Sequence, residues 1–199
     1  LSRNMGLSIE QQFVKRVIDI IGSMIGIIIT IPFFIVIGLS IKLTDHGPIF
    51  YTQTRLTKDG RPFKIYKFRT MIQNAEKDGI PRLAAEEDPR ILPVGRLDEL
   101  PQVLNILKGD MSIVGPRPER PELVEEFTNE IPEFPDRMKV KAGLTGYAQV
   151  YGKYNTTPYD KLKFDLMYIR KYSVLLDLKL IIMTPKILFL KESTEGVEK

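Results

Sequence analysis

The chain has 199 residues, a net charge of +4 at neutral pH and no cysteine, and these properties already exclude several functions. Its length suffices for one domain with a real core. Disulfides, thiolate nucleophiles and cysteine-ligated zinc are excluded, and the single histidine, His46, excludes a polyhistidine metal site within one chain. A hard metal ion would need Asp and Glu oxygens, which favours Mg²⁺ or Mn²⁺. The charge is too weak to indicate nucleic-acid binding, but it suits a membrane surface or phosphorylated substrates.

A polar lead-in at 1–14 precedes an uncharged apolar run from Ile20 to Ile41. A helix rises by about 1.5 Å per residue, so this run could cross a bilayer core of roughly 30 Å. Pro32 stands in its middle, where it removes a backbone donor and kinks a helix. The segment 15–43 is therefore expected in the membrane, either as a kinked helix that crosses or as a helix–break–helix that enters and leaves by one face. We expect the re-entrant form.

Two short strands are predicted after the membrane segment, at Ile49–Thr54 and Phe63–Phe68. Asp59-Gly60 between them is a hairpin signal, so the strands are expected to pair antiparallel. Residues 71–78 look helical, and 79–93 form a loop rich in proline and acidic residues.

The rest of the chain is predicted to be mostly helical, which gives an α+β fold with one small antiparallel element. The expected elements are a helix over 98–108 that ends at Gly109, an irregular stretch with three prolines at 115–121, a helix at Glu122–Asn129, a strand or turn-strand at Leu144–Val150 and an amphipathic helix at Tyr159–Lys171.

The C-terminal stretch from Tyr172 to Leu190 is apolar but contains Asp177, Lys179 and Lys186. Such a pattern suits a helix that lies in the membrane interface with its lysines reaching toward water. An ordinary helix that faces the core has the same pattern, so both interpretations stay open.

Asp98 and Glu99 are adjacent carboxylates just before a predicted helix, and two interpretations fit them. Asp98 suits an N-cap, and Glu99 suits the positive end of the helix dipole. Neighbours on a helix diverge by about 100°, so the pair is poorly placed to share one proton. It is better suited to a division of labour, in which one carboxylate attacks a phosphoryl group and the other holds a metal.

Cationic residues at two other places suit a phosphorylated substrate. Arg117 stands between two prolines in a stiff loop, and its guanidinium fork matches phosphate oxygens. Lys64 and Lys67 belong to the second predicted strand and Arg69 follows it directly, so some of these cations face inward. The structural alternatives are a solvated turn for Arg117 and a charged edge strand for the others.

Several stretches, taken in this order, resemble the monotopic polyprenyl-phosphate phosphoglycosyl transferases, the bacterial sugar transferase family. The resemblance covers nearly the whole chain, and the block around Asp98 is its most specific part. The matching stretches are KRVIDIIGS at 15–23, the segment around Pro32, GPIFYTQTR at 47–55, FKIYKFRTM at 63–71, LDELPQVLNILKGDMSIVGPRPE at 97–119, AGLTGYAQVYG at 142–152 and KFDLMYIRKYS at 163–173.

The resemblance implies a reaction. Such enzymes transfer a sugar-1-phosphate from a UDP-sugar to a polyprenyl phosphate such as undecaprenyl phosphate and release UMP. The residue that matches Asp98 is the nucleophile, and the one that matches Glu99 is the Mg²⁺ ligand, with Mn²⁺ as a substitute. Arg117 matches an arginine that clamps phosphate. The other matching positions that we expect to bind substrate are Lys64, Lys67, Arg69, Arg90, Gln149 and Asp165.

The resemblance also implies a place in the cell. The re-entrant helix would hold a catalytic domain, residues 44–199, on the cytoplasmic face of the bacterial inner membrane. The expected partners are membrane lipids, a UDP-hexose such as UDP-glucose or UDP-galactose, and polyprenyl phosphate, with a homo-oligomer left open. The chain would be the catalytic module of a longer enzyme of exopolysaccharide or capsule assembly.

Two departures from the family pattern stand out. Ile31 replaces the serine that often precedes the break proline, and Thr30 offers a hydroxyl instead. Val94-Gly95-Arg96 runs directly into Leu97, where the family usually has several more residues. Two alternatives to the proposed reaction are a non-catalytic membrane scaffold and a UDP-releasing glycosyltransferase. The second usually needs an Asp-x-Asp motif beside a nucleotide fold, and none is found.

Overall fold

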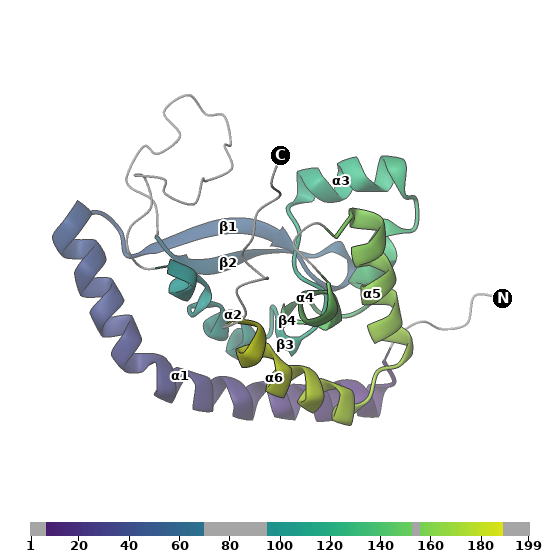
Figure 1. The fold of residues 1–199 in the computed structure, drawn as a ribbon, viewed down its shortest axis with the longest axis horizontal. Coiled ribbons are helices and arrows are strands. Elements are labelled where there is room, and N and C mark those ends of the chain that lie inside the picture. Colours follow the sequence, from purple (N-terminus) through teal and green to yellow (C-terminus); the bar gives the residue numbers. More distant parts are fainter. Residues whose placement is uncertain (1–6, 70–94, 153–155, 189–199) are drawn as a thin grey trace.

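The computed structural model describes residues 7–69, 95–152 and 156–188, which form a mostly helical α+β fold with two small sheets. Figure 1 shows the long helix α1 along one side of the molecule, the strands β1 and β2 above it, and shorter helices between and beside them. The predicted fold class and its small antiparallel hairpin are confirmed. The predicted helix at 71–78, the loop at 79–93 and Arg90 lie outside the described residues.

The elements follow the predicted order closely. The helices are α1 (Ile9–Asp45), α2 (Gln102–Lys108), α3 (Pro121–Glu130), α4 (Tyr147–Tyr151), α5 (Pro158–Arg170) and α6 (Val174–Leu188), with 3-10 helices η1 (Lys58–Gly60), η2 (Gly95–Glu99) and η3 (Phe134–Lys139). The strands are β1 (Phe50–Leu56), β2 (Pro62–Phe68), β3 (Ser112–Val114) and β4 (Gly143–Thr145).

Helix α1 contains the whole apolar run predicted to enter the membrane. A capping box begins it: the Ser8 hydroxyl accepts from the Gln11 amide at 3.2 Å, and the Ser8 amide donates to the Gln11 side chain at 2.9 Å. The helix therefore starts at Ile9, inside the lead-in that was predicted to extend to residue 14. Among the described residues, α1 is the one helix long and apolar enough to cross a membrane, and an 18-residue window within it has a mean hydropathy of 2.7.

Pro32 lies inside α1 and does not end it. The helix is continuous through this position, and its C-terminal half turns upward toward the strands in Figure 1. The Thr30 hydroxyl donates to the Gly26 carbonyl oxygen at 2.7 Å, a bond that itself favours bending. The segment is one bent helix rather than two helices joined by a break, so the predicted helix–break–helix is not confirmed.

The first turns of α1 are tied to the domain by buried polar contacts. Lys15 pairs with Asp177 of α6 at 2.5 Å, and both side chains are almost fully buried. The Asp19 carboxylate accepts from the Ser112 hydroxyl of β3 at 2.9 Å. Arg16 donates to two carbonyl oxygens at the end of α2, each at 2.7 Å. These charges fix α1 because breaking a buried pair would leave an uncompensated charge.

The far end of α1 packs on the same domain through apolar contacts. Ile37 and Ile41 are buried in a cluster with Phe68 of β2. Between these two attachments, none of residues 24–36 is buried. The two ends of α1 therefore hold one domain, while the middle of the helix exposes its apolar surface.

The hairpin positions one row of side chains toward the core. Phe50 pairs with Phe68 and Leu56 with Pro62, and Asp59 takes a left-handed conformation (φ 57°) in the turn, as the Asp-Gly signal predicts. Because side chains alternate along a strand, Lys67 falls in the same row as the buried Phe63 and Ile65.

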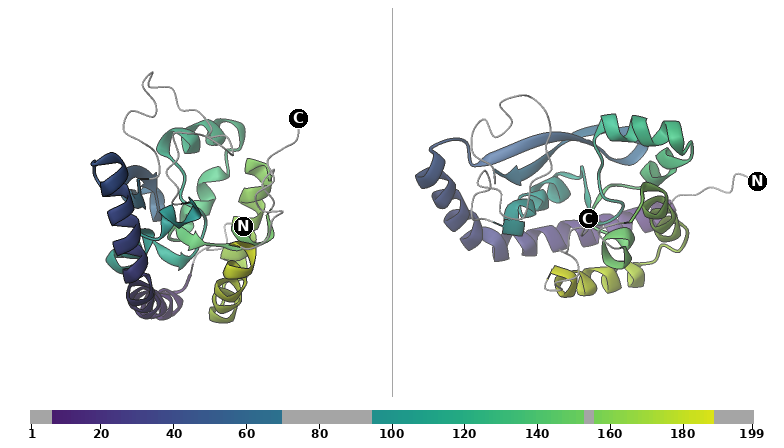
Figure 2. Two further views of the ribbon diagram at one scale, coloured as in Figure 1. Left: turned by 60° about the vertical axis from the view of Figure 1, so that its left-hand side comes forward. Right: turned by 45° about the horizontal axis from the view of Figure 1, so that its top comes forward.

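Helix α2 covers the open edge of β2 and lies between the hairpin and α1, as Figures 1 and 2 both show. Asn105 makes the link and is fully buried. Its side chain accepts from the Tyr66 amide at 2.9 Å and donates to the Lys64 carbonyl oxygen at 2.8 Å. The side-chain amide thus pairs with the strand edge as another strand would.

The C-terminal part differs from the prediction in one element. The stretch predicted as a strand or turn-strand at Leu144–Val150 divides into β4, which pairs parallel with β3, and the helix α4. Helix α6 buries Asp177 and Leu180, as a helix that faces the core does, while Leu175 and Ile182 on it are 77% and 76% exposed.

Candidate active site

Asp98 and Glu99 end the 3-10 helix η2, and the α-helix after them begins only at Gln102. The N-cap position of α2 is occupied by Pro101, which makes no side-chain cap bond. The interpretation of Asp98 as the cap of a helix over 98–108 is therefore wrong. Pro101 explains the shift, since the residue before a proline disfavours helical angles. The predicted end of the helix at Gly109 (φ 94°) is confirmed.

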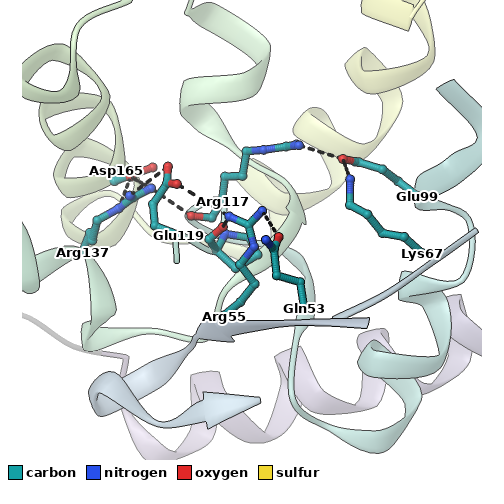
Figure 3. A network of polar contacts seen from close by, with 9 residues as sticks. Gln53, Arg55, Lys67, Glu99, Arg117, Glu119, Arg137 and Asp165 are labelled. Carbon is teal, nitrogen blue, oxygen red and sulfur yellow. Dashed lines mark hydrogen bonds and ion pairs between the residues drawn. The ribbon is translucent and has the colours of Figure 1, made fainter. Parts of the chain in front are cut away.

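The two carboxylates converge on one ammonium instead of diverging. Lys67 Nζ donates to Asp98 Oδ2 at 3.0 Å and to Glu99 Oε1 at 3.1 Å. Arg117 Nη2 donates to the same Glu99 oxygen at 2.7 Å (Figure 3). Within the described ranges, no hydrogen bond or ion pair reaches Asp98 Oδ1 or Glu99 Oε2.

These cations determine the charge of Glu99. Burial alone would raise its pKa, but the charges and hydrogen bonds of Arg117 and Lys67 outweigh burial and lower the pKa to about 2. Burial likewise opposes the charge of Arg117, and Glu99 more than offsets it, so the pKa of Arg117 is raised. Both groups are ionised at neutral pH. The Arg117 side chain is still 52% exposed, so it can also reach a bound anion.

The loop that carries Arg117 is clamped against β4. Gly115 N donates to the Thr145 carbonyl oxygen at 2.8 Å, and Gly143 N donates to the Pro116 carbonyl oxygen at 2.9 Å. A Cβ atom on Gly143 would lie 2.0 Å from Gly115 N, so this close approach requires glycine. The two prolines and this clamp hold the arginine rigidly, as the sequence predicts for a Pro-Arg-Pro loop.

A second ion-pair network supports the same loop on the side away from Glu99 (Figure 3). Arg137 donates to Asp165 Oδ2 of α5 at 2.9 Å and to the Arg117 carbonyl oxygen at 3.0 Å. It also lies 3.5 Å from a carboxylate oxygen of Glu119, which pairs on its other side with Arg55 at 3.9 Å. Asp165 therefore acts on the loop through Arg137, and it is too deeply buried to touch a substrate in this arrangement.

Two further predicted substrate residues, Lys64 and Gln149, form no hydrogen bond or ion pair with Asp98 or Glu99. Lys64 points to the other face of β2 and donates to the Thr54 hydroxyl at 2.9 Å. Arg69 follows β2 and is buried. Gln149 lies on α4, where its side-chain amide is buried and forms no hydrogen bond with another described residue. Arg90 lies outside the described residues.

The donor set at the site suits a hard divalent ion. Asp98 and Glu99 each have an oxygen that forms no hydrogen bond or ion pair within the described ranges, and Mg²⁺ is commonly held by one or two carboxylates plus substrate phosphates. No group of three or more metal-binding side chains occurs in the described ranges. The residues therefore fit an ion completed by water and phosphate oxygens, and they do not form a complete protein cage.

Sequence reasoning missed some residues of the site. Arg137 carries no local signal, because its partners Glu119 and Asp165 are distant in the chain. Arg55 lies within one of the stretches that match the family, at 47–55. Only the register of β1 shows that its side chain faces the site. It lines a small pocket together with Lys67, Glu99 and Arg117. Three cations and one carboxylate face this pocket, which suits an anionic substrate.

Comparisons with known proteins show which proteins this chain is similar to. The chain is 40% identical over 181 residues to the UDP-N-acetylgalactosamine-undecaprenyl-phosphate N-acetylgalactosaminephosphotransferase of Aeromonas hydrophila, covering 86% of this chain and 43% of that protein. It is 39% identical over 189 residues to the UDP-glucose:undecaprenyl-phosphate glucose-1-phosphate transferase of Escherichia coli, covering 89% of this chain and 40% of that protein.

A third relative is shorter. The putative undecaprenyl-phosphate N-acetylgalactosaminyl 1-phosphate transferase of Bacillus subtilis is 49% identical over 131 residues, covering 63% of this chain and 73% of that protein. The chain thus spans about two fifths of the length of the first two relatives. The family model described as "Bacterial sugar transferase" matches residues 10–191, which is most of the chain. This chain belongs to the bacterial sugar transferase family.

Proposed function

We propose that the chain transfers a sugar-1-phosphate from a UDP-sugar to a polyprenyl phosphate and releases UMP. The observation that carries this proposal is the meeting of Asp98 and Glu99 with Lys67 and Arg117 at one accessible place. A carboxylate beside two cations is suited to attack on a phosphoryl group whose charge must be neutralised. The names of the relatives, which specify UDP-sugars and undecaprenyl phosphate, support the same reaction.

The reaction has two displacement steps at one phosphorus atom. An oxygen of Asp98 attacks the phosphorus that carries the sugar, the bond from this phosphorus to the bridging oxygen breaks, and UMP leaves with the electron pair. An oxygen of the polyprenyl phosphate then attacks the same phosphorus and frees Asp98. The bond between the sugar and its phosphate is never broken, so UDP is not a product.

The surrounding residues have separate roles in this proposal. Lys67 orients Asp98 and Glu99 and neutralises part of the diphosphate charge. Arg117 and Arg55 contact phosphate oxygens from the loop and from β1. Arg137 and Asp165 position the Arg117 loop without touching the reacting atoms.

Glu99, with Asp98 beside it, would hold Mg²⁺, and Mn²⁺ suits the same oxygen donors. When bound, the ion would neutralise charge on the diphosphate and on the departing UMP. Lys67 and Arg117 contact Glu99 through one oxygen, Oε1, which leaves Oε2 for the ion.

We propose that α1 enters the membrane and returns to the same, cytoplasmic, face of the bacterial inner membrane. Both ends of α1 pack on one domain, at Lys15 and Asp19 on one side and at Ile41 on the other. A helix that crossed the bilayer would leave the domain at one end. The exposed Leu175 and Ile182 of α6 support an interfacial position for that helix.

Nucleotide release tests the proposed reaction. The lipid-embedded chain is mixed with Mg²⁺, polyprenyl phosphate and a panel of UDP-glucose, UDP-galactose and UDP-N-acetylgalactosamine, beside an Asp98→Asn variant. We expect UMP from at least one donor, and a loss of at least about 10³-fold in the variant. Release of UDP would indicate plain glycosyl transfer, and release of neither nucleotide by folded protein would indicate a membrane scaffold.

A further inference from the structure

A basic pocket, separate from the candidate active site, lies between the first turns of α1, η1 and the chain before β4. Its volume is about 160 Å³, roughly ten times the minimum that holds one water molecule. It shares no lining residue with the small pocket beside Glu99. The cations that line it are Lys15, Arg16, Lys58, Lys139 and Lys141.

The described carboxylates near the basic pocket have hydrogen-bond or ion-pair partners, but the partners of Asp19 are neutral, so its charge still acts on Lys141. Asp19, the one acidic residue among its described lining residues, accepts hydrogen bonds from the Ser112 hydroxyl and the Ile113 amide, each at 2.9 Å. Lys15 pairs with Asp177. Lys139 pairs with Asp136 at 2.8 Å, outside the lining.

Two lysines of the basic pocket have no carboxylate partner in the described ranges. Lys58 donates to the neutral side-chain amide of Gln12 at 3.3 Å. Lys141 makes no ion pair or hydrogen bond with another described side chain, although it is only partly exposed. Burial lowers the pKa of Lys141 most, the charges of Arg16, Arg61 and Lys58 lower it further, and the charge of Asp19 opposes them. A bound anion would relieve this repulsion.

If α1 enters the membrane as proposed, the basic pocket would lie at the depth of the lipid headgroups. Gln12, Lys15, Arg16 and Asp19 share one face of α1, as their spacing requires, and this face lines the pocket. The opposite face exposes apolar side chains, with Val14 41% and Ile21 54% exposed. A helix is about 10 Å across, so an apolar face in the acyl boundary would place the pocket among phosphate groups.

We propose that the basic pocket binds the phosphate group of an anionic phospholipid, at a site distinct from Asp98 and Glu99. Lysine and arginine are the side chains that bind phosphate headgroups at a membrane surface. Lys58 and Lys141 supply positive charge that forms no ion pair within the described ranges. Arg16 and Lys15 are held in place by their own partners and form a rigid wall of the pocket. The site would orient the domain on the membrane without entering the reaction.

Thermal unfolding of the detergent-solubilised full chain tests this site. Short-chain phosphatidylglycerol, short-chain phosphatidylcholine and inorganic phosphate are added separately. We expect phosphatidylglycerol to raise Tm by about 5 to 10 °C at roughly a hundred times Kd. Phosphatidylcholine should have no effect. The shift should vanish in Lys58→Gln/Lys141→Gln and persist in Lys141→Arg and in Lys163→Gln, an exposed lysine on α5 that is distant from the pocket.

Each result decides between the sources of phosphate. In one outcome, inorganic phosphate raises Tm as much as phosphatidylglycerol does, and only when Lys58 and Lys141 are present. That result would identify the ligand as a soluble phosphate and overturn the lipid assignment. No shift with any ligand, or an equal shift in Lys58→Gln/Lys141→Gln, would overturn the site itself. The Tm of that variant without ligand, compared with the parent, shows that it folds.

Discussion

At the scale of single residues, Glu99 is the point where two cations meet. Arg117 donates to Oε1 at 2.7 Å and Lys67 donates to the same atom at 3.1 Å. Asp98 touches only Lys67 among the described residues. This asymmetry supports different roles for two adjacent carboxylates: Glu99 is held fixed, and Asp98 keeps the freedom that a nucleophile needs to approach phosphorus.

The pH dependence of stability tests the electrostatics of Glu99. Because its folded pKa, about 2, lies below its ordinary value of 4.5, its stabilisation is fully present above about pH 4.5 and is lost as the pH falls toward 2. Arg117→Gln removes the main cation, so the difference in Tm from wild type should shrink between pH 5 and pH 2. Arg170→Gln, at an exposed position, serves as the control. A difference that stays constant with pH would contradict the assigned pKa.

Asp165 is a buried acid that contacts the Arg117 loop through Arg137. Burial raises the pKa of Asp165 to about 6, while Arg137 opposes that shift. Asp165→Asn should destabilise the chain by about 3 to 5 kcal/mol, because Arg137 then keeps a buried charge with a weaker partner. It should also raise KM for the donor, since Arg137 holds the Arg117 carbonyl oxygen.

Steady-state kinetics and thermal unfolding measure these two effects of Asp165→Asn. Asp160→Asn on the exposed side of the same helix is the matched control and should cost no more than about 1 kcal/mol. An Asp165→Asn variant with wild-type Tm and KM would show that the network does not position the loop.

At the scale of elements, one side chain links α2 to the edge of the hairpin by hydrogen bonds. Asn105 pairs with both Tyr66 N and the Lys64 carbonyl oxygen and is fully buried. This contact fixes the distance between β2, which carries Lys67, and the turn that carries Glu99. The site therefore depends on a side-chain amide that forms the hydrogen bonds a neighbouring strand would form.

Asn105→Ala should destabilise the chain by about 2 to 4 kcal/mol, since it leaves two backbone groups without their partner. For a chain of this size, Tm should fall by about 4 to 16 °C. Asn129→Ala, at an exposed position on α3, is the control and should leave Tm nearly unchanged. An equal Tm for both variants would mean that α2 is held by its apolar contacts alone.

The elements also show where local sequence signals suffice. The hairpin follows from Asp59-Gly60 and the end of α2 from Gly109, because these turns depend on a few adjacent residues. The start of α2 and the helix α4 were missed. Pro101 shifts the start of α2 to Gln102. Helix α4 has only five residues, and its apolar pattern also fits a strand.

The site shows the complementary limit. Asp98, Glu99 and Arg117 could be predicted because a specific motif contains them, and the structure brings them together with Lys67. Arg137 could not, because it contacts the site only through the fold. Lys64 and Lys67 are three residues apart, and only the strand register decides which one faces the carboxylates.

At the scale of the whole molecule, α1 decides how the domain meets the membrane. Its two ends pack on one domain while residues 24–36 stay unburied. The chain has no cysteine, so single cysteines can report the side of each end. We expect Glu10→Cys and His46→Cys to react with an impermeant maleimide in inverted inner-membrane vesicles and not in intact cells. Labelling of Glu10→Cys from outside would show that α1 crosses the membrane.

The most direct test of the account is whether the sugar-bearing phosphate becomes attached to Asp98. The lipid-embedded chain is mixed with Mg²⁺ and a UDP-sugar labelled in that phosphate, without polyprenyl phosphate, and the protein is then quenched and digested. The account predicts label on the peptide that contains Asp98, one UMP released per labelled chain, and neither in Asp98→Asn. UMP release that requires polyprenyl phosphate and leaves the protein unlabelled would contradict it, because the acceptor would then attack the donor directly.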